Sequence, residues 1–176
     1  MIIALSANTH MPSKTRTLLE TLVETFEAAS GLPVQSHDLV VHGREMGACY
    51  SKSELPVASR ALLDSIEQAD GLIVTSPVYK GSYSGLFKHV FDLVDSASLR
   101  NKPVLLGATG GGLRHALMVE HQMRPLFGFF GALSVPTAVY ASDSEFADGR
   151  CVDPCLLERC REAVAEFLTL YRGVVV

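Results

Sequence analysis

Apolar residues along the chain fall into two alternating patterns. Short continuous runs of strand length alternate with longer segments in which apolar positions recur three and four residues apart, the period of a helix buried on one face. The runs predict strands at residues 2–5, 34–38, 72–75, 104–108 and 134–140. The periodic segments predict a helix that begins at Ser13 or Thr15 and ends at Gly31, and helices at residues 58–69, 83–96, 113–130 and 154–171. Residues 40–56 are predicted to form a long polar connection.

Regular alternation of strand and helix is typical of a doubly wound α/β fold, because each helix returns the chain for the next parallel strand. For five strands and five helices the natural choice is the flavodoxin-like order 2-1-3-4-5, a five-stranded parallel sheet with helices on both faces. A chain of 176 residues suits one core, so we expect a single domain over residues 1–176.

The loops after the first, third and fourth predicted strands are unusual in composition. They read SANTHMPSKT at residues 6–15, TSPVYKGSYSG at residues 75–85 and TGGG at residues 109–112. In the order 2-1-3-4-5 these loops meet at the carboxyl edge of the sheet, where such folds bind their ligands. Their small residues would let backbone groups approach a flat polar ligand such as a nucleotide-like cofactor. The alternative is a set of tight connections that bind nothing.

The first loop has the features of a phosphate site. Backbone N–H groups are unpaired at the start of the helix that follows it, and that end of the helix dipole is positive. The side chains that could complete the site are Asn8, His10 or Lys14, Ser13 and Thr15. The loop lacks both G-x-x-x-x-G-K-[ST] and G-x-G-x-x-G, so a single phosphate, as on a mononucleotide, is favoured over a triphosphate. The alternative is a plain serine-capped helix.

The second and third loops suit a ring. Pro77, Val78 and Tyr79 could pack against a ring face while their backbone groups meet its polar edge, and Ser84 would lie at the start of the next helix. The successive glycines of residues 110–112 allow positive φ and close approach of backbone to a ligand.

Composition narrows the class of partner. Lys and Arg number 15 against 19 Asp and Glu, and no segment gathers basic residues, which argues against nucleic acid and anionic membranes. The first residues lack a signal-peptide pattern, and the longest uncharged span, residues 125–142, is interrupted by glycine and proline. We therefore expect a soluble cytoplasmic protein. The four cysteines lack metal-ligand spacing, so no metal site is predicted.

Three segments, SANTHMPSKTRTLLE, ADGLIVTSPVYKGSYSGLFKHVFDLV and ATGGG, together resemble the NADPH-dependent FMN reductase family. The likeness spans nearly the whole chain and is strongest toward reductases of sulfonate-sulfur assimilation, with S-P-V-Y-K-x-x-Y-S-G as its most specific part. It implies FMN and NADPH as cofactors and a two-component, flavin-dependent monooxygenase as partner. The first loop departs from the family's frequent G-S-x-R pattern, because it has Ala7, Asn8 and His10 in this place. A neutral imidazole, as on His10, is a weaker phosphate ligand than a guanidinium.

Carried over position by position, the resemblance assigns two sets of flavin-binding residues. Those that would hold the FMN phosphate are Asn8, His10, Ser13 and Thr15. Those that would line the isoalloxazine ring are Pro77, Val78, Tyr79, Ser84, Thr109, Gly110 and Gly111. Lys80 or Arg114, near the ligand edge, could meet the 2′-phosphate of NADPH. The redox chemistry belongs to the two nucleotides, so no catalytic acid, base or nucleophile is predicted.

Pro125 lies within the predicted helix at residues 113–130 and has no N–H for the carbonyl of His121. The helix should bend or widen there, for example by a π-type turn that pairs residue 121 with residue 126. The position resembles a π-helical insertion at a tetramer interface of related reductases, which implies that His121 governs flavin retention and release. The alternative is that His121 only packs between subunits.

Apolar residues on more than one face of the predicted helix at residues 113–130 predict a homodimer, and the resemblance implies a tetramer.

Two other functions fit the same fold. A flavodoxin-like electron carrier is usually far more acidic and often flanks its flavin with Trp, which this chain lacks. Within enzymes the alternative is a quinone or azo reductase that keeps its flavin bound. The sequence leaves open whether FMN is substrate or prosthetic group and whether NADPH or NADH is preferred.

Overall fold

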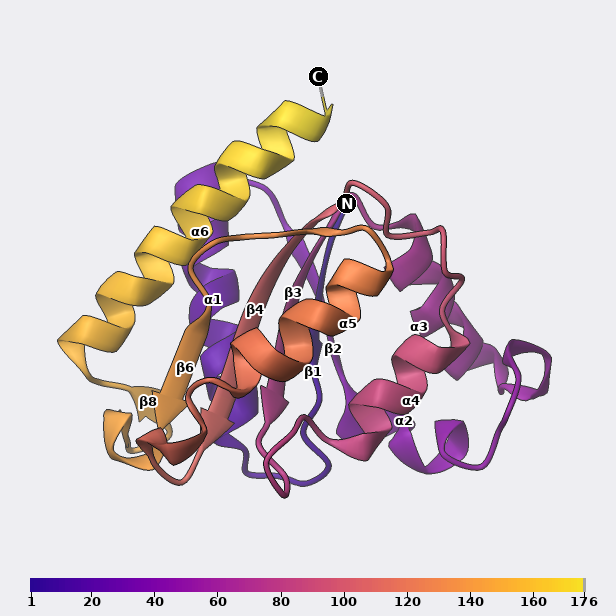
Figure 1. Cartoon of the computed structure of the whole chain (residues 1–176), viewed down its shortest axis with the longest axis horizontal. Coiled ribbons are helices and arrows are strands. Elements are labelled where there is room, and N and C mark those ends of the chain that lie inside the picture. The colour runs from indigo at the N-terminus through magenta and orange to yellow at the C-terminus, as the bar shows by residue number, and fades with distance from the viewer. Residues whose placement is uncertain (176) are drawn as a thin grey trace.

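The computed structural model describes residues 1–175, and its central feature is a parallel β-sheet with helices on both faces (Figure 1). In spatial order the strands are β2 (Val34–Asp38), β1 (Ile2–Ser6), β3 (Gly71–Pro77), β4 (Pro103–Gly110) and, sharing the last position, β5 (Leu133–Ser134) and β6 (Val139–Ser142). All pairings within this sheet are parallel. The predicted flavodoxin-like order 2-1-3-4-5 is therefore confirmed. Within residues 1–175, no helix has the length and apolar content needed to cross a membrane.

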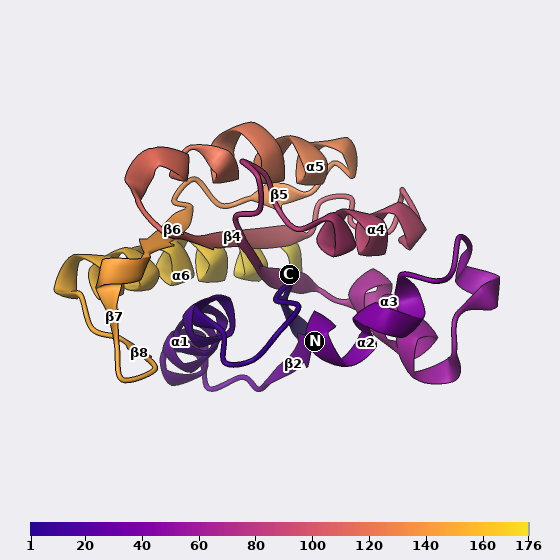
Figure 2. The same cartoon turned by 90° about the horizontal axis from the view of Figure 1, so that it is seen from below.

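The helices divide between the two faces of the sheet. In chain order they are α1 (Lys14–Ser30), α2 (Leu39–Met46), α3 (Val57–Gln68), α4 (Gly85–Leu93), α5 (Arg124–Phe129) and α6 (Pro154–Val175). Ile73 and Leu105 point from the sheet into the cluster formed with α1 and α6, whereas Val74 and Leu106 point into the cluster formed with α2 to α5. Figure 2 shows α4 and α5 on one side of β4 and α1 on the other.

Helix α1 shows why the sequence predicted its ends well. The Ser13 hydroxyl accepts a hydrogen bond from the Arg16 amide over 3.3 Å, which satisfies one of the free N–H groups of the first turn. Gly31 ends the helix with φ of 69° and donates its N–H to the Glu27 carbonyl. Between these caps the apolar stripe, which includes Phe26, is buried against the sheet and α6. The side chain that fixes the start of α1 thus lies in the first of the unusual loops.

The prediction of a long polar connection at residues 40–56 was wrong. The segment begins with helix α2 and also contains a short 3-10 helix, Lys52–Glu54. Asp38 caps α2 by accepting a hydrogen bond from the Val40 amide over 3.1 Å, and Leu39 and Met46 bury the inner face of the helix. A helix of eight residues with only two buried apolar positions gives a weak periodic signal, which is why it was missed.

The predicted helix at residues 113–130 is not continuous. It consists of a 3-10 helix (Leu113–His115), a turn, a π-helix (Val119–Met123) and then α5. In the π-helix the Arg124 amide donates to the Val119 carbonyl, five residues back, immediately before Pro125. Pro125 stands in the first turn of α5, where a missing N–H costs least.

The predicted strand at residues 134–140 is also interrupted. The β5 and β6 segments both pair with β4, but Pro136 lies between them and has no N–H to donate to the ladder. The second segment continues to Ser142, two residues beyond the predicted end. As a result the carboxyl end of the last strand position reaches the same edge of the sheet as the ends of β1, β3 and β4.

Aromatic rings form the centre of the core beneath α4 and α5. Phe91 contacts Phe87 and Phe127 with ring centroids 4.8 and 4.9 Å apart, and Phe127 is fully buried. Edge-on and tilted packing of this kind adds to the stabilisation that comes from apolar burial. The cluster joins helices from two parts of the chain and holds the π-helix and α5 against the sheet.

We predict that Phe127→Ala lowers the free energy of unfolding by about 3–5 kcal/mol, because it leaves a cavity in this cluster. Tyr50→Ala is the matched control, since Tyr50 is 90% exposed. Its effect should stay within about 0.5 kcal/mol. Urea unfolding followed by circular dichroism measures both values. A small loss for Phe127→Ala, equal to that of the control, would contradict the packing described.

Candidate functional site

The three unusual loops leave the sheet side by side. The Ala7 amide donates to the Thr75 carbonyl, and the Val78 amide donates to the Thr109 carbonyl, each over 2.8 Å. These bonds continue the parallel pairing of β1 with β3 and of β3 with β4 into the loops. The loops enclose a cavity of about 320 Å³ at the carboxyl edge of the sheet, the edge that Figure 2 views from below.

Ten of the twelve predicted site residues line this cavity. They are Asn8, His10, Ser13, Thr15, Pro77, Val78, Tyr79, Thr109, Gly110 and Gly111. The lining also includes Pro12, Lys14 and Asp143. The structure therefore brings together residues that lie as far apart as 8 and 143 in the sequence.

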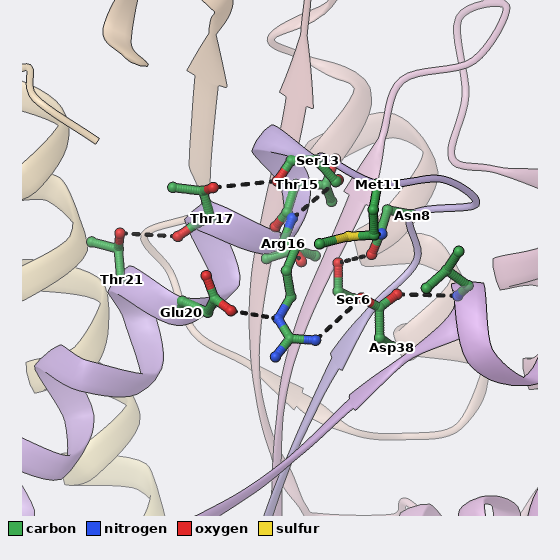
Figure 3. A network of polar contacts seen from close by, with 12 residues as sticks. Ser6, Asn8, Met11, Ser13, Thr15, Arg16, Thr17, Glu20, Thr21 and Asp38 are labelled. Atoms are coloured by element: carbon green, nitrogen blue, oxygen red, sulfur yellow. Dashed lines mark hydrogen bonds and ion pairs between the residues drawn. The ribbon is translucent and has the colours of Figure 1, made fainter. Parts of the chain in front are cut away.

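The start of α1 presents hydrogen-bond donors to the cavity. The first bond of the helical ladder runs from the Thr17 amide to the Ser13 carbonyl over 3.1 Å, so the amides of Lys14 and Thr15 precede it. Figure 3 shows Ser13 and Thr15 at this end of the helix. The Lys14 ammonium adds a positive charge and pairs with the Asp143 carboxylate over 2.9 Å. An anionic group placed here would meet N–H donors, hydroxyls and a cation.

Asn8 holds the shape of the first loop. Its side chain is almost fully buried; Oδ1 accepts a hydrogen bond from the Ser6 hydroxyl over 2.6 Å, and Nδ2 donates to the His10 carbonyl over 3.0 Å. Both polar ends of Asn8 therefore take part in bonds within the loop, as Figure 3 shows for the contact with Ser6. Asn8 therefore holds the first loop in place beside the start of α1.

Arg16 does not line the cavity, although it lies in the first turn of α1. Its guanidinium binds Asp38 over 3.1 Å and Glu20 over 2.8 Å (Figure 3). Asp38 is 6% exposed, so this charge is largely desolvated and needs its partner. The contact ties α1 to the end of β2. Lys14 lines the cavity, whereas Arg16 does not.

The second loop meets the first at the outer rim. The Tyr79 hydroxyl lies 3.3 Å from Thr9 Oγ1 and 3.5 Å from His10 Nδ1. Tyr79 is 38% exposed, so these contacts can break without opening the core. His10 therefore has a neighbour at the mouth of the cavity.

The third loop is shaped by Tyr140, a residue of β6. Its hydroxyl donates to the Gly112 carbonyl over 2.6 Å. Burial raises the pKa of Tyr140, and the Asp143 and Glu145 carboxylates raise it further, so the phenol remains a donor at neutral pH. A Cβ on Gly110 would clash with the Tyr140 hydroxyl, so this position favours glycine.

Buried hydroxyls join the first and third loops. Thr15 Oγ1 and Thr109 Oγ1 lie 2.6 Å apart, and the Thr75 hydroxyl donates to the Thr15 carbonyl over 3.1 Å. Thr15 and Thr109 are both less than 10% exposed. These bonds fix the start of α1 relative to β3 and β4. They therefore also fix the part of the cavity at the start of α1 relative to the part lined by residues 77–79 and 109–111.

Two predicted residues do not line the cavity. Ser84 is buried; its hydroxyl donates to the Ala7 carbonyl over 3.2 Å and accepts from the Phe87 amide over 3.3 Å. Ser84 therefore caps α4 and ties it to the first loop. His121 is an exposed residue of the π-helix.

Two cavity residues, Pro12 and Asp143, are not among those expected from the sequence, and Asp143 is the charged one. It begins the short 3-10 helix that follows β6. The fifth strand position is parallel to the others, so the loop after it also had to reach the carboxyl edge. That rule was a sufficient signal to place the loop after the last strand, and Asp143 in it, beside the site.

Comparison with known proteins shows the family of this chain. The family model described as NADPH-dependent FMN reductase matches residues 1–147, which include all the cavity residues. The chain belongs to this family. Among relatives, it is 46% identical to an "NADH-dependent FMN reductase SfnF" of Pseudomonas fluorescens over 97% of this chain and 91% of the relative.

A second relative and a solved structure agree. The chain is 44% identical to an "FMN reductase (NADPH)" of Pseudomonas aeruginosa, over 98% of this chain and 92% of the relative. The X-ray structure of an oxidoreductase from Corynebacterium diphtheriae superposes with a TM-score of 0.87 at 28% identity, over 98% of this chain and 96% of that one. The likeness in sequence and the likeness in fold therefore both extend along almost the whole length of the protein.

Proposed function

We propose that this protein is an NAD(P)H-dependent FMN reductase that supplies reduced flavin to a flavin-dependent monooxygenase of sulfonate metabolism. The observation that carries the proposal is the single cavity formed by the three loops, with helix-end donors in one part and proline, tyrosine and glycine in another. It occurs in a chain that belongs to the FMN reductase family. The monooxygenase and the sulfur compound rest on the sequence resemblance.

The donor set of the cavity fits FMN. A phosphate would be held by the amides of Lys14 and Thr15 together with the Ser13 hydroxyl, all at the start of α1. The isoalloxazine ring would lie along residues 77–79 and 109–111, where Gly110 lets the backbone approach. The acidic Asp143 is neutralised by Lys14, so it does not repel the phosphate as a free carboxylate would.

The bound flavin would supply the chemistry by accepting a hydride from dihydronicotinamide. The chain's own task is to orient the two rings and exclude water from between them. Tyr79 at the rim and Val78 at the boundary of the cavity are placed for that task. The names of the relatives differ in the nucleotide, one NADH and one NADPH, so both reductants belong in the test.

A steady-state assay tests the function directly. We expect rapid oxidation of NADPH or NADH that depends on added FMN and saturates with it, because FMN is bound and released as a substrate. Riboflavin should be used less well than FMN, since it lacks the phosphate that the start of α1 would hold. FAD should also be used less well, since its phosphate carries an adenylate group. Tight retention of flavin with turnover of quinones or azo dyes would instead indicate the rival reductase. Flavin binding without nucleotide oxidation would indicate an electron carrier.

Gly110→Ala tests the placement of the flavin. The added Cβ must displace the Tyr140 hydroxyl and break its bond to Gly112, so we expect FMN affinity to fall about tenfold or more, as for loss of a buried hydrogen bond. Gly128→Ala is the control, because a Cβ there meets no atom within 4 Å. Titration of FMN fluorescence measures both.

The double variant Gly110→Ala/Tyr140→Phe sharpens the same test. Phenylalanine has no hydroxyl to clash with the added Cβ, but it also cannot bond Gly112, so the double variant should regain only the part of the affinity that the clash costs. Wild-type FMN affinity in the single variant would place the flavin elsewhere.

The protein forms a homo-oligomer, dimer or tetramer, as a further part of the proposal. Large apolar side chains are exposed on the segment from the third loop to β5: Leu113, Leu117, Phe129 and Leu133 are between 37% and 75% exposed. A second copy that covers this segment would remove them from water. The π-helix and His121 lie within the same segment, which supports placing His121 at the interface.

His121→Ala tests whether this residue controls flavin retention. If it does, the dissociation constant of FMN and the rate of flavin transfer to a monooxygenase change severalfold, while sedimentation equilibrium still shows the wild-type oligomer. An altered oligomer with unchanged FMN affinity would leave His121 a packing role alone. Tyr50→Ala is the control, because Tyr50 is exposed and lines neither cavity.

A further inference from the structure

A second cavity adjoins the proposed flavin site. Its volume is about 720 Å³, and it shares Val78 and Gly111 with the lining of the first cavity. The side chains of Lys80, Arg114 and His115 also line it. A ligand that touches the flavin ring at this boundary could therefore extend into the second cavity without leaving the protein surface.

A tight turn and a 3-10 helix present these side chains. Tyr79 and Ser82 exchange backbone hydrogen bonds of 2.8 and 3.1 Å, which closes a two-residue turn at Lys80 and Gly81. Both turn residues have positive φ, 52° and 87°, so the turn is of the type that fits a tight hairpin. On the opposite side, Arg114 and His115 belong to the 3-10 helix that follows the glycines of the third loop.

The charges of this cavity are unbalanced. Neither Lys80 nor Arg114 forms an ion pair with any residue in the described range 1–175, and no carboxylate of that range lines the cavity. In the first cavity, by contrast, Lys14 is matched by Asp143. A local excess of positive charge in a chain of net charge −4 lowers the energy of an anionic ligand at that spot.

We propose that Lys80 and Arg114 bind the phosphate groups of the nicotinamide nucleotide. The inference rests on the proposed function, because a nucleotide whose nicotinamide contacts the flavin ring must place its phosphates outside the flavin cavity. The flavin's own phosphate has donors at the start of α1, so it does not need these cations. Arginine and lysine are the side chains that recognise phosphate, the first by paired hydrogen bonds and the second as a point charge.

The variants are Lys80→Gln, Arg114→Gln and the double variant, which keep much of each side chain and remove its charge. Arg44→Gln is the matched control, because Arg44 is an exposed arginine of α2 that lines neither cavity. Steady-state kinetics with FMN would compare NADPH, NADH and reduced nicotinamide riboside, which has no phosphate. Calorimetry would measure the binding of oxidised NADP⁺, a readout that needs no turnover.

We expect each single variant to raise KM for NADPH and the Kd for NADP⁺ about tenfold, the loss of one charged hydrogen bond, with kcat and FMN affinity unchanged. Kinetics with reduced nicotinamide riboside should not change. A loss confined to NADPH would place the 2′-phosphate between the two cations, and an equal loss with NADH would place the pyrophosphate there.

Wild-type Kd for NADP⁺ in the double variant would overturn the inference, as would an equal loss with the phosphate-free reductant. A wild-type protein that binds NADP⁺ through these residues but does not reduce FMN would overturn the proposed function and leave the phosphate site in place. The two failures are therefore distinguishable.

Discussion

Two backbone hydrogen bonds at the carboxyl edge of the sheet determine the geometry of the site. They join Ala7 to Thr75 and Val78 to Thr109, and each measures 2.8 Å. Because they extend the parallel ladder beyond the strands, the loops after β1, β3 and β4 start as neighbours with fixed spacing. The hydroxyl pair of Thr15 and Thr109, and the rim contact of Tyr79, can form only from that start.

The two adjoining cavities at this edge of the sheet differ in their electrostatic environment. In the cavity at the start of α1, the Lys14 ammonium is balanced by Asp143, and the attraction for an anion comes largely from backbone N–H groups. In the neighbouring cavity, Lys80 and Arg114 have no such partner among the residues that the structure describes. Cations without a partner add long-range attraction for a charged ligand. The arrangement is consistent with two phosphorylated ligands that meet ring to ring.

Polar residues of the loops divide into those that face the cavity and those that build it, and the sequence did not distinguish them. Ser13 and Ser84 both cap helices, yet Ser13 lines the cavity while Ser84 is buried between the first loop and α4. Asn8 was predicted to bind phosphate, and its polar atoms bond within the loop. A hydroxyl or amide in a loop has no periodic neighbours that reveal its direction, so its partner is decided by the chain that folds over it.

The sequence by itself determined the strand and helix alternation, the parallel order and the edge where the site forms, because apolar periodicity and parallel topology follow from local pattern and from general rules of chain connection. It also determined ten of the cavity residues through the composition of three loops. Tertiary structure alone decided the pairing of Arg16 with Asp38, the approach of Asp143 to Lys14, and the gathering of Lys80 and Arg114 around one cavity. These contacts join residues far apart in the chain, and only the folded geometry fixes which charges meet.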